Sequence, residues 1–230
     1  MLDTVMLHKT SAIRTDRCVW RSAPTIADDH KLDEPLLKKL FKRDDHTCQF
    51  CGFQSNEGME PYHHNDDHSN NHIENLLTAC GFCHASQHLG YVAETKSASL
   101  IYLPEIDQYE LNSILRAIYL VQLSGTLSEI NNVVEDILDF VYMRRDVADE
   151  LIGDQESIVS LSKILRPLKD QHREGMLEPL KDFRIMHKCT SLFGSSATYR
   201  KLASTWLFDT YGFGRVKTDN WHTHFQKLTN

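Results

Sequence analysis

The sequence has no run of about 18 consecutive apolar residues, so it offers no candidate for a membrane-spanning helix. Its start, MLDTVMLHKTSAIR, lacks the continuous apolar stretch at the centre of a secretion signal. Glycine and proline are scarce, with 10 and 6 among 230 residues, and there is no internal repeat. What remains is an ordinary globular composition, 41% apolar and 25% charged. We expect a protein without direct membrane insertion that stays in the cytoplasm, where thiols are kept reduced.

The central part of the sequence also lacks a basic field. Residues 34–96 carry 5 positive and 9 negative side chains, and residues 97–160 carry 3 and 12. Only residues 161–230 are basic, with 12 positive and 6 negative side chains. Proteins that grip nucleic acid concentrate Lys and Arg near the gripping surface, because phosphate contacts dominate the affinity. The acidic centre therefore argues against nucleic acid as a partner.

Two short cysteine motifs stand out against this background. CQFC and CGFC place four of the six cysteines in two C-x-x-C pairs, at 48–51 and 80–83. Each pair can present two thiolates from one tight turn, and two such turns can close a tetrahedron around zinc. With all four positions taken by protein, the ion would be structural, and we expect one Zn²⁺ per chain on Cys48, Cys51, Cys80 and Cys83. The alternatives are a thioredoxin-like dithiol or two pairs of buried thiols.

Histidines crowd the second motif. Residues 62–88, YHHNDDHSNNHIENLLTACGFCHASQH, contain six of them. With LLKKLFKRDDHTCQFCG before it, this segment resembles the HNH nuclease family in its zinc-ribbon form, over about residues 34–90. The resemblance implies that His64 is the general base and that Asn75 orients it. It also implies a second metal ion, which would stabilise charge on a phosphate, with the ligands His63, His84 and His88.

Two departures from that family argue against catalysis. The stretch that leads from His64 to Asn75 is shorter than is usual, and it lacks the family's common Pro and Gly-Gly. Misplacing a base by about 1 Å can cost about a hundredfold in rate, and the neighbouring carboxylates repel phosphate. We therefore expect no catalytic residues, and histidines that cap turns or bond to backbone. Solvated loop residues are expected at His46, His68 and His72. An active HNH endonuclease stays open as the alternative.

Helical periodicity dominates the rest of the chain. Apolar residues recur at helical spacing and predict helices over 105–123, 127–145, 154–168 and 195–214. Residues 167–190 have mixed polarity and predict a loop with one short helix. The predicted fold class is α+β, a small zinc-stabilised ββα (HNH-like) module with an added, mainly α-helical C-terminal layer. The expected domains are an N-terminal extension (1–33), the zinc-ribbon module (34–96) and a mainly helical region with a basic tail (97–230).

A second resemblance covers more of the chain. The sequence is similar to the IcmJ/DotN family of the Dot/Icm type IVB secretion system in WRSAP at 20–24, FKRDDHTCQFCGF at 41–53, DHSNNHIENLLTACGFCHASQHLGY at 67–91 and IYLPEIDQYELNSILRAIYL at 101–120. This resemblance implies a non-enzymatic adaptor that binds a segment of the coupling ATPase DotL and other coupling-complex subunits. It also implies a place on the cytoplasmic face of the inner membrane, held there through the complex. A zinc-ribbon protein that binds nucleic acid without cutting it is the third interpretation.

Overall fold

The computed structural model describes residues 32–65, 67–124, 128–165, 179–193 and 195–208. Nearly all of the expected N-terminal extension, and the tail beyond residue 208, lie outside these described residues. The fold is mixed α+β and mostly helical, with two small two-stranded sheets, which confirms the predicted α+β class at this level. Among the described helices, none is long and apolar enough to cross a membrane.

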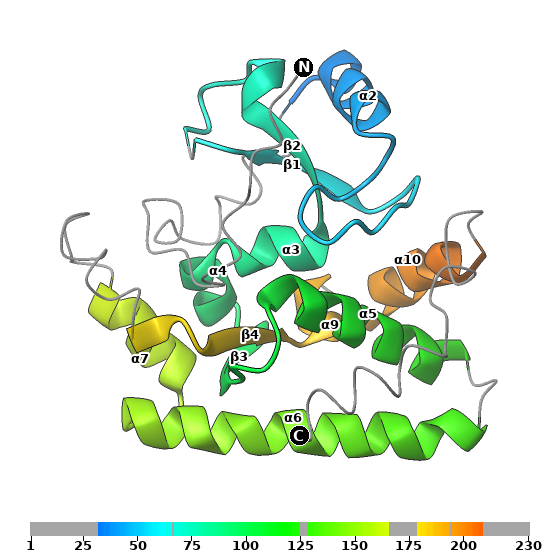
Figure 1. Cartoon of the computed structure of the whole chain (residues 1–230). Helices are drawn as coiled ribbons and strands as arrows, with labels where there is room; N and C mark the ends of the chain where they lie inside the picture. The colour runs from blue at the N-terminus through cyan, green and yellow to red at the C-terminus, as the bar shows by residue number, and fades with distance from the viewer. Residues whose placement is uncertain (1–31, 66, 125–127, 166–178, 194, 209–230) are drawn as a thin grey trace.

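The first sheet and its helices form the upper part of the molecule in Figure 1. They are, in chain order, α2 (Glu34–Arg43), β1 (Met59–His63), the 3-10 turn η2 (Ile73–Asn75), β2 (Leu76–Cys80) and α3 (Gly81–Ser86). The two strands pair antiparallel, with Met59 opposite Cys80. Helix α2 begins at a side-chain cap, where Asp33 accepts a hydrogen bond from the backbone N–H of Leu36 at 2.9 Å. The buried Leu40 then packs α2 onto the hairpin.

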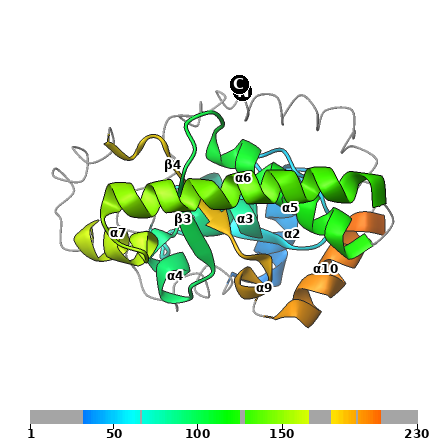
Figure 2. The same cartoon turned by 90° about the horizontal axis from the view of Figure 1, so that it is seen from below.

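The second sheet lies below the first and is flanked by the longer helices. The elements are α4 (Leu89–Glu94), β3 (Ala98–Tyr102), α5 (Gln108–Ser124), α6 (Ser128–Ile152), α7 (Ser157–Leu165), β4 (Phe183–His187), α9 (Cys189–Leu192) and α10 (Ser196–Phe208). Strand β3 pairs antiparallel with β4, and Ala98 lies opposite His187. Helix α6 packs along β3, and α5 lies against β4 and α3. Figure 1 shows α6 as the lowest layer, and Figure 2 shows it running across the face seen from below.

Strand β4 corrects the prediction of a loop with one short helix over residues 167–190. Its sequence, FRIMH, is too short and too mixed in polarity to show a period of two. It forms a strand because β3, much earlier in the chain, supplies the hydrogen bonds. The amide side chain of Gln108 covers the other edge at Ile185, accepting from its N–H at 2.7 Å and donating to its carbonyl at 2.8 Å.

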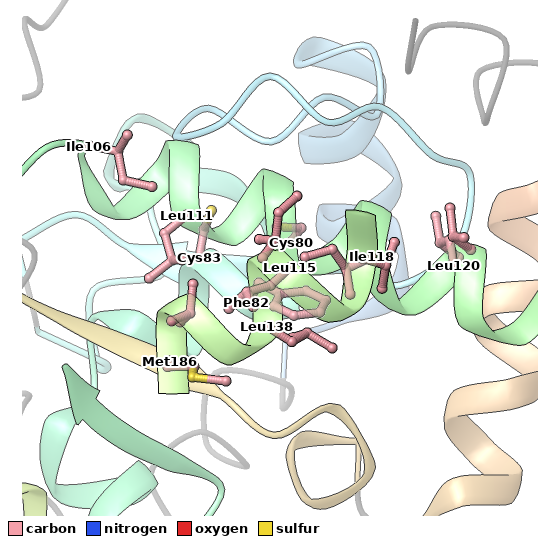
Figure 3. Packing of buried hydrophobic residues seen from close by; sticks show 14 of the residues in the cluster. Cys80, Phe82, Cys83, Ile106, Leu111, Leu115, Ile118, Leu120, Leu138 and Met186 are labelled. Carbon is pink, nitrogen blue, oxygen red and sulfur yellow. The ribbon is translucent and has the colours of Figure 1, made fainter. Parts of the chain in front are cut away.

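One hydrophobic core joins the upper hairpin to the helical layer. Figure 3 shows Cys80, Phe82 and Cys83 of the upper part packed together with Leu115 of α5 and Leu138 of α6. The same cluster reaches α10 through Ala203 and Trp206. The core therefore crosses from the expected zinc-ribbon module into the helical region, and the two parts pack as one body.

Trp206 is the largest fully buried side chain that α10 contributes to this core. Its indole N–H donates to the carbonyl of Glu57 at 3.1 Å, and its ring meets Phe53 edge-on at 5.4 Å between centroids. This side chain of α10 thus closes the loop that follows the first cysteine pair. Gly58 leaves room for it, since a Cβ there would lie 3.2 Å from the indole.

We predict that Trp206→Ala lowers the free energy of unfolding by about 3–5 kcal/mol, the usual cost of deleting a large buried aromatic side chain. Chemical denaturation followed by circular dichroism measures this loss. Lys201→Ala, at an exposed position of the same helix, is the matched control and should change stability by less than about 0.5 kcal/mol. A loss below about 1 kcal/mol for Trp206→Ala would show that α10 does not hold the core closed.

Candidate metal centre

The four cysteines of the two C-x-x-C pairs meet in the structure. Their sulfur atoms all lie within 4.8 Å of one another, and all four cysteines are free. The Sγ atoms of Cys51 and Cys80 are 3.8 Å apart. A tetrahedron with Zn–S bonds of about 2.3 Å has edges of about 3.8 Å. Cys48, Cys51, Cys80 and Cys83 therefore fit a tetrahedral ion that prefers sulfur, such as zinc.

The first pair sits in a turn that folds back on itself after α2. The N–H of Cys48 donates to the carbonyl of Phe53 at 2.7 Å, and the N–H of Gly52 donates to the carbonyl of Cys48 at 2.9 Å. Gly52 has a φ of 73°, a conformation that a residue without a Cβ adopts at no steric cost. The N–H of Gln49 donates to the carbonyl of Thr78 at 2.8 Å, which ties this turn to β2.

The second pair spans the junction between a strand and a helix. Cys80 is the last residue of β2, and Cys83 lies in the first turn of α3. Both are fully buried. Because β2 is held in register by β1, the hairpin fixes where this pair meets the first one.

Arg43 and Asp44, just ahead of the first pair, tie α2 to this hairpin. The guanidinium of Arg43 donates to the carbonyls of Ile73 and Leu76 at 2.7 and 2.8 Å, and it also binds the carboxylate of Asp44. The same carboxylate accepts from the N–H of Thr78 at 2.9 Å. Arg43 and Asp44 thus align the two cysteine turns.

Helix α5 adds two polar side chains to the sulfur cluster. Arg116, buried at 6% exposure, places its guanidinium 3.5 Å from the sulfur of Cys80 and 3.7 Å from that of Cys51. The face of the guanidinium also stacks 4.0 Å above the ring of Phe53. One turn earlier, Asn112 donates to the sulfur of Cys83 at 3.4 Å. The helical layer therefore supplies N–H donors and a positive charge to the cysteines.

These contacts set the charge state of the site. Hydrogen bonds from the neighbouring cysteines, together with the charge of Arg116, hold the pKa of Cys51 well below its usual value. Burial raises the pKa of Cys83, because a lone thiolate is unfavourable away from water. Burial alone would lower the pKa of Arg116, but the charge of Cys51, Cys80 and Cys83 raises it, so the arginine stays charged. With a divalent ion bound, four thiolates would leave two negative charges, and Arg116 would compensate one of them.

A buried hydrogen-bond network runs from the cysteines to the second sheet. The hydroxyl of Ser86 donates to the carbonyl of Phe82 at 2.8 Å and accepts from Asn112 at 3.1 Å. The one hydroxyl proton of Ser86 is already donated to Phe82, so Ser86 must act as the acceptor toward His187. The Nε2–H of His187 therefore donates to the Ser86 hydroxyl at 2.8 Å. Burial lowers the pKa of His187 to about 3, so its imidazole is neutral. The network links the α3 end of the metal centre to β4.

The three histidines that the HNH resemblance assigned to a second metal, His63, His84 and His88, are all buried. The rings of His84 and His88 lie 5.0 Å apart between centroids. His68, expected in solvent, is half-buried instead and lies 5.0 Å from His63 and 6.3 Å from His88. Within the described residues, the group whose ligand atoms converge is the four cysteines and not these histidines.

His64 and Asn75 are held by the loop that joins β1 to β2. The side chain of His64 is exposed, and its backbone N–H donates to the carbonyl of Asn75 at 2.8 Å. The amide of Asn75 accepts from the N–H of Asn65 at 3.0 Å and donates to the carbonyl of Asn70 at 2.8 Å. The bonds of the Asn75 side chain therefore go to the backbone of the loop that follows His64.

Three residues at these sites do not emerge from the sequence analysis. Asn112 and Arg116 stand one helical turn apart inside an apolar stripe, a spacing that puts both on the buried face of α5. A buried arginine needs a negatively charged partner. The position of Arg116 inside the apolar stripe was therefore the signal that could have indicated its contact with the cysteines. Glu60, which binds Nδ1 of His84 at 2.7 Å, gives no such signal, since β1 has no periodic pattern of its own.

Comparison with known proteins gives one informative match. No model of a protein family matches the chain. The type 4 apparatus protein DotN of Legionella pneumophila is 30% identical over 184 aligned residues, which cover 76% of this chain and 81% of DotN.

We predict one zinc ion per chain by elemental analysis of the purified protein. Cys83→Ala should bring this to near zero and lower the melting temperature, because the metal supplies part of the folding free energy. Cys189→Ala, which removes a cysteine outside the two motifs, is the matched control and should keep the zinc. Full zinc occupancy in Cys83→Ala would contradict a site built from four thiolates.

We also predict that Arg116→Met weakens zinc binding by about 10–100-fold, the usual effect of losing a group that bonds to metal ligands. Competition with a chromophoric chelator measures the affinity. Arg116→Lys should lose less, because it keeps the charge but not the planar guanidinium. Arg145→Met on α6 removes a cation away from the cysteines and should leave the affinity unchanged. Equal affinities in Arg116→Met and the unmodified chain would remove Arg116 from the metal centre.

Proposed function

The chain belongs to the DotN family of type 4 apparatus proteins, and from this premise we propose that it is a non-enzymatic adaptor of a Dot/Icm type IVB coupling complex. In this role it binds a segment of the coupling ATPase DotL and contacts further subunits of the complex. The complex keeps it on the cytoplasmic face of the inner membrane. One structural zinc ion fixes the shape of its binding surfaces.

The observation that carries the proposal is the identity with DotN over most of both chains. Identity of 30% over 184 residues preserves a fold, and it gives the two proteins a common architecture on which partners can act. The adaptor role is further supported by the way the core is built. Because α5, α6 and α10 share one core with the cysteine turns, the protein presents preformed surfaces and loses little conformational freedom on binding.

The proposal extends to the fold of the upper part. We assign residues 34–96 to a zinc-ribbon ββα module related to the HNH fold. The hairpin β1–β2, followed at once by α3 with a cysteine pair at the junction, supports this assignment. Four cysteine ligands leave no open position on the ion, so zinc there has a structural role and no part in a reaction.

The absence of catalysis is supported by the surroundings of His64. A general base must lie within hydrogen-bond reach of the water it deprotonates, beside the ion that binds the phosphate. His64 is exposed while His63, His84 and His88 are buried, and the amide of Asn75 bonds to loop backbone. The carboxylate of Glu60, which lies 2.7 Å from Nδ1 of His84, also disfavours a phosphate near these histidines.

One contact favours the alternative, a metal-dependent HNH endonuclease. Nδ1 of His84 lies 2.7 Å from a carboxylate oxygen of Glu60, and metal-binding histidines are commonly oriented by such a carboxylate. The alternative predicts nicking of supercoiled plasmid with magnesium, manganese or nickel, abolished by His64→Ala. No cleavage by folded, zinc-loaded protein across the three metals would exclude it.

We predict that the purified full chain binds a DotL segment and that His64→Ala binds it equally well. Isothermal titration with purified DotL fragments measures the affinity. His72→Ala, at a second exposed histidine of the same loop, is the matched control for His64→Ala. Cys83→Ala should lose binding together with zinc, because the core that the cysteine turns share with α5 and α6 is disrupted.

Two results would contradict the adaptor role. One is a full chain that is folded and zinc-loaded and yet binds no DotL fragment. The other is a His64→Ala variant that keeps fold and zinc but loses binding while the His72→Ala control retains it, since this would place His64 in the essential machinery.

A further inference from the structure

We propose that the outward face of α6 is a docking surface for a basic amphipathic helix of a protein partner. The inference deepens the adaptor role and rests on it, because it names the surface and the chemistry of what binds there. Helix α6 has 25 residues, so it is about 38 Å long, and it runs across the outside of the molecule in Figure 2.

The first observation is an exposed apolar ridge. Met143, Val147 and Leu151 are 60%, 38% and 59% exposed and follow one another at every fourth position. Residues at this interval form a ridge on a helix, and such ridges insert into the grooves of a second helix. Among the described residues, the exposed large hydrophobic side chains are concentrated here, since Tyr142 of α6 is another and Ile164 of the adjoining α7 completes the set.

The ridge is not needed to hold α6 in place. A different side of the helix is buried through Val134, Ile137, Val141 and Ala148, and these residues pack it onto the rest of the protein. A surface helix with one buried stripe is complete as a folding unit. A second apolar stripe on its solvent side is therefore unexplained by folding and marks an interaction site.

The second observation is the charge around the ridge. The sequence of α6 contains seven acidic residues and two basic ones. Asp139, Asp146 and Glu150 are exposed and stand three or four positions from members of the ridge, which places them along its edge. Asp136 and Glu135 extend the acidic edge toward the start of the helix.

Both cations of α6 are already paired with carboxylates. The guanidinium of Arg144 binds Glu105, and the Nε of Arg145 lies 3.3 Å from Asp149. Neither offsets the acidic edge, so like charges repel one another along it in the free protein. A partner that brings Lys or Arg beside its own apolar stripe relieves this repulsion while it covers the ridge.

The same charges disfavour the other occupants. A second copy of the chain would bring one acidic edge against another. An anionic lipid surface and nucleic acid would both repel the carboxylates. A basic helix with apolar residues at every third or fourth position matches both the ridge and its edge.

Two independent sets of substitutions test the surface in the full chain. Asp139→Lys combined with Asp146→Lys and Glu150→Lys reverses the charge, and Met143→Ser combined with Leu151→Ser removes the ridge. Glu94→Lys, at an exposed position of α4, is the control for charge reversal. All are surface changes, and zinc content with thermal melting checks that each variant is folded.

The variants are titrated with the DotL fragment that the unmodified chain binds. We expect each α6 set to weaken binding at least tenfold and Glu94→Lys to change it less than twofold. Binding by the unmodified chain should also weaken as salt rises from about 50 to about 500 mM, because salt screens exposed charges. Carbodiimide cross-linking should join α6 carboxylates to lysines of the partner.

Several results would overturn the inference. One is an affinity within twofold of the unmodified chain for both α6 sets, and another is a set of cross-links that map only to other surfaces. Concentration-dependent dimerisation lost in the ridge variant would instead assign the face to a second copy, and binding to phosphatidylglycerol vesicles would assign it to a membrane. An unmodified chain that binds no fragment contradicts the adaptor role itself, a different outcome from intact binding by the α6 variants.

Discussion

Four sulfur atoms drawn from two turns that are distant in the sequence meet within 4.8 Å of one another. Such a cluster is unfavourable as thiolates alone, because negative charge accumulates away from water. It becomes favourable with a divalent cation at its centre and a guanidinium at its side. Arg116 reaches the sulfurs from α5, so the helical layer takes part in the electrostatics of the metal centre as well as in its packing. The relative position of the two layers follows from this constraint.

The constraint extends through bonds that can be followed residue by residue. Asn112 contacts both Cys83 and Ser86, Ser86 accepts from His187, and Gln108 joins Asn112 to the backbone of Ile185. Every link is buried, and a buried hydrogen-bond network favours one arrangement of the elements that carry it. The metal centre, α5 and β4 are thereby fixed relative to one another. In the proposed adaptor role, surfaces fixed in this way could be presented to a partner without reorganising.

The sequence is informative where chemistry is local and poor where it depends on distant partners. The spacing within each C-x-x-C pair follows from one turn, so the cysteine cluster can be predicted, as can the helices with long apolar stripes. Strand β4 cannot, because its identity comes from pairing with β3, which precedes it by three of the described helices, α5, α6 and α7. Arg116 lies in a helix whose sequence signal is its apolar residues, and the sulfurs it contacts belong to elements much earlier in the chain. His68 is half-buried against expectation because a polar loop gives no sign of which ring it will meet.

The closure of the core by α10 has a consequence for synthesis of the protein. Trp206 covers the loop after the first cysteine pair, and β4 completes a sheet that β3 begins. The emerging chain therefore makes its cysteine turns long before the elements that seal them have left the ribosome. During that interval an ion bound by the four sulfurs would be the tie that keeps Cys48 and Cys83 together, and the nascent chain keeps apolar surfaces uncovered until α10 is made.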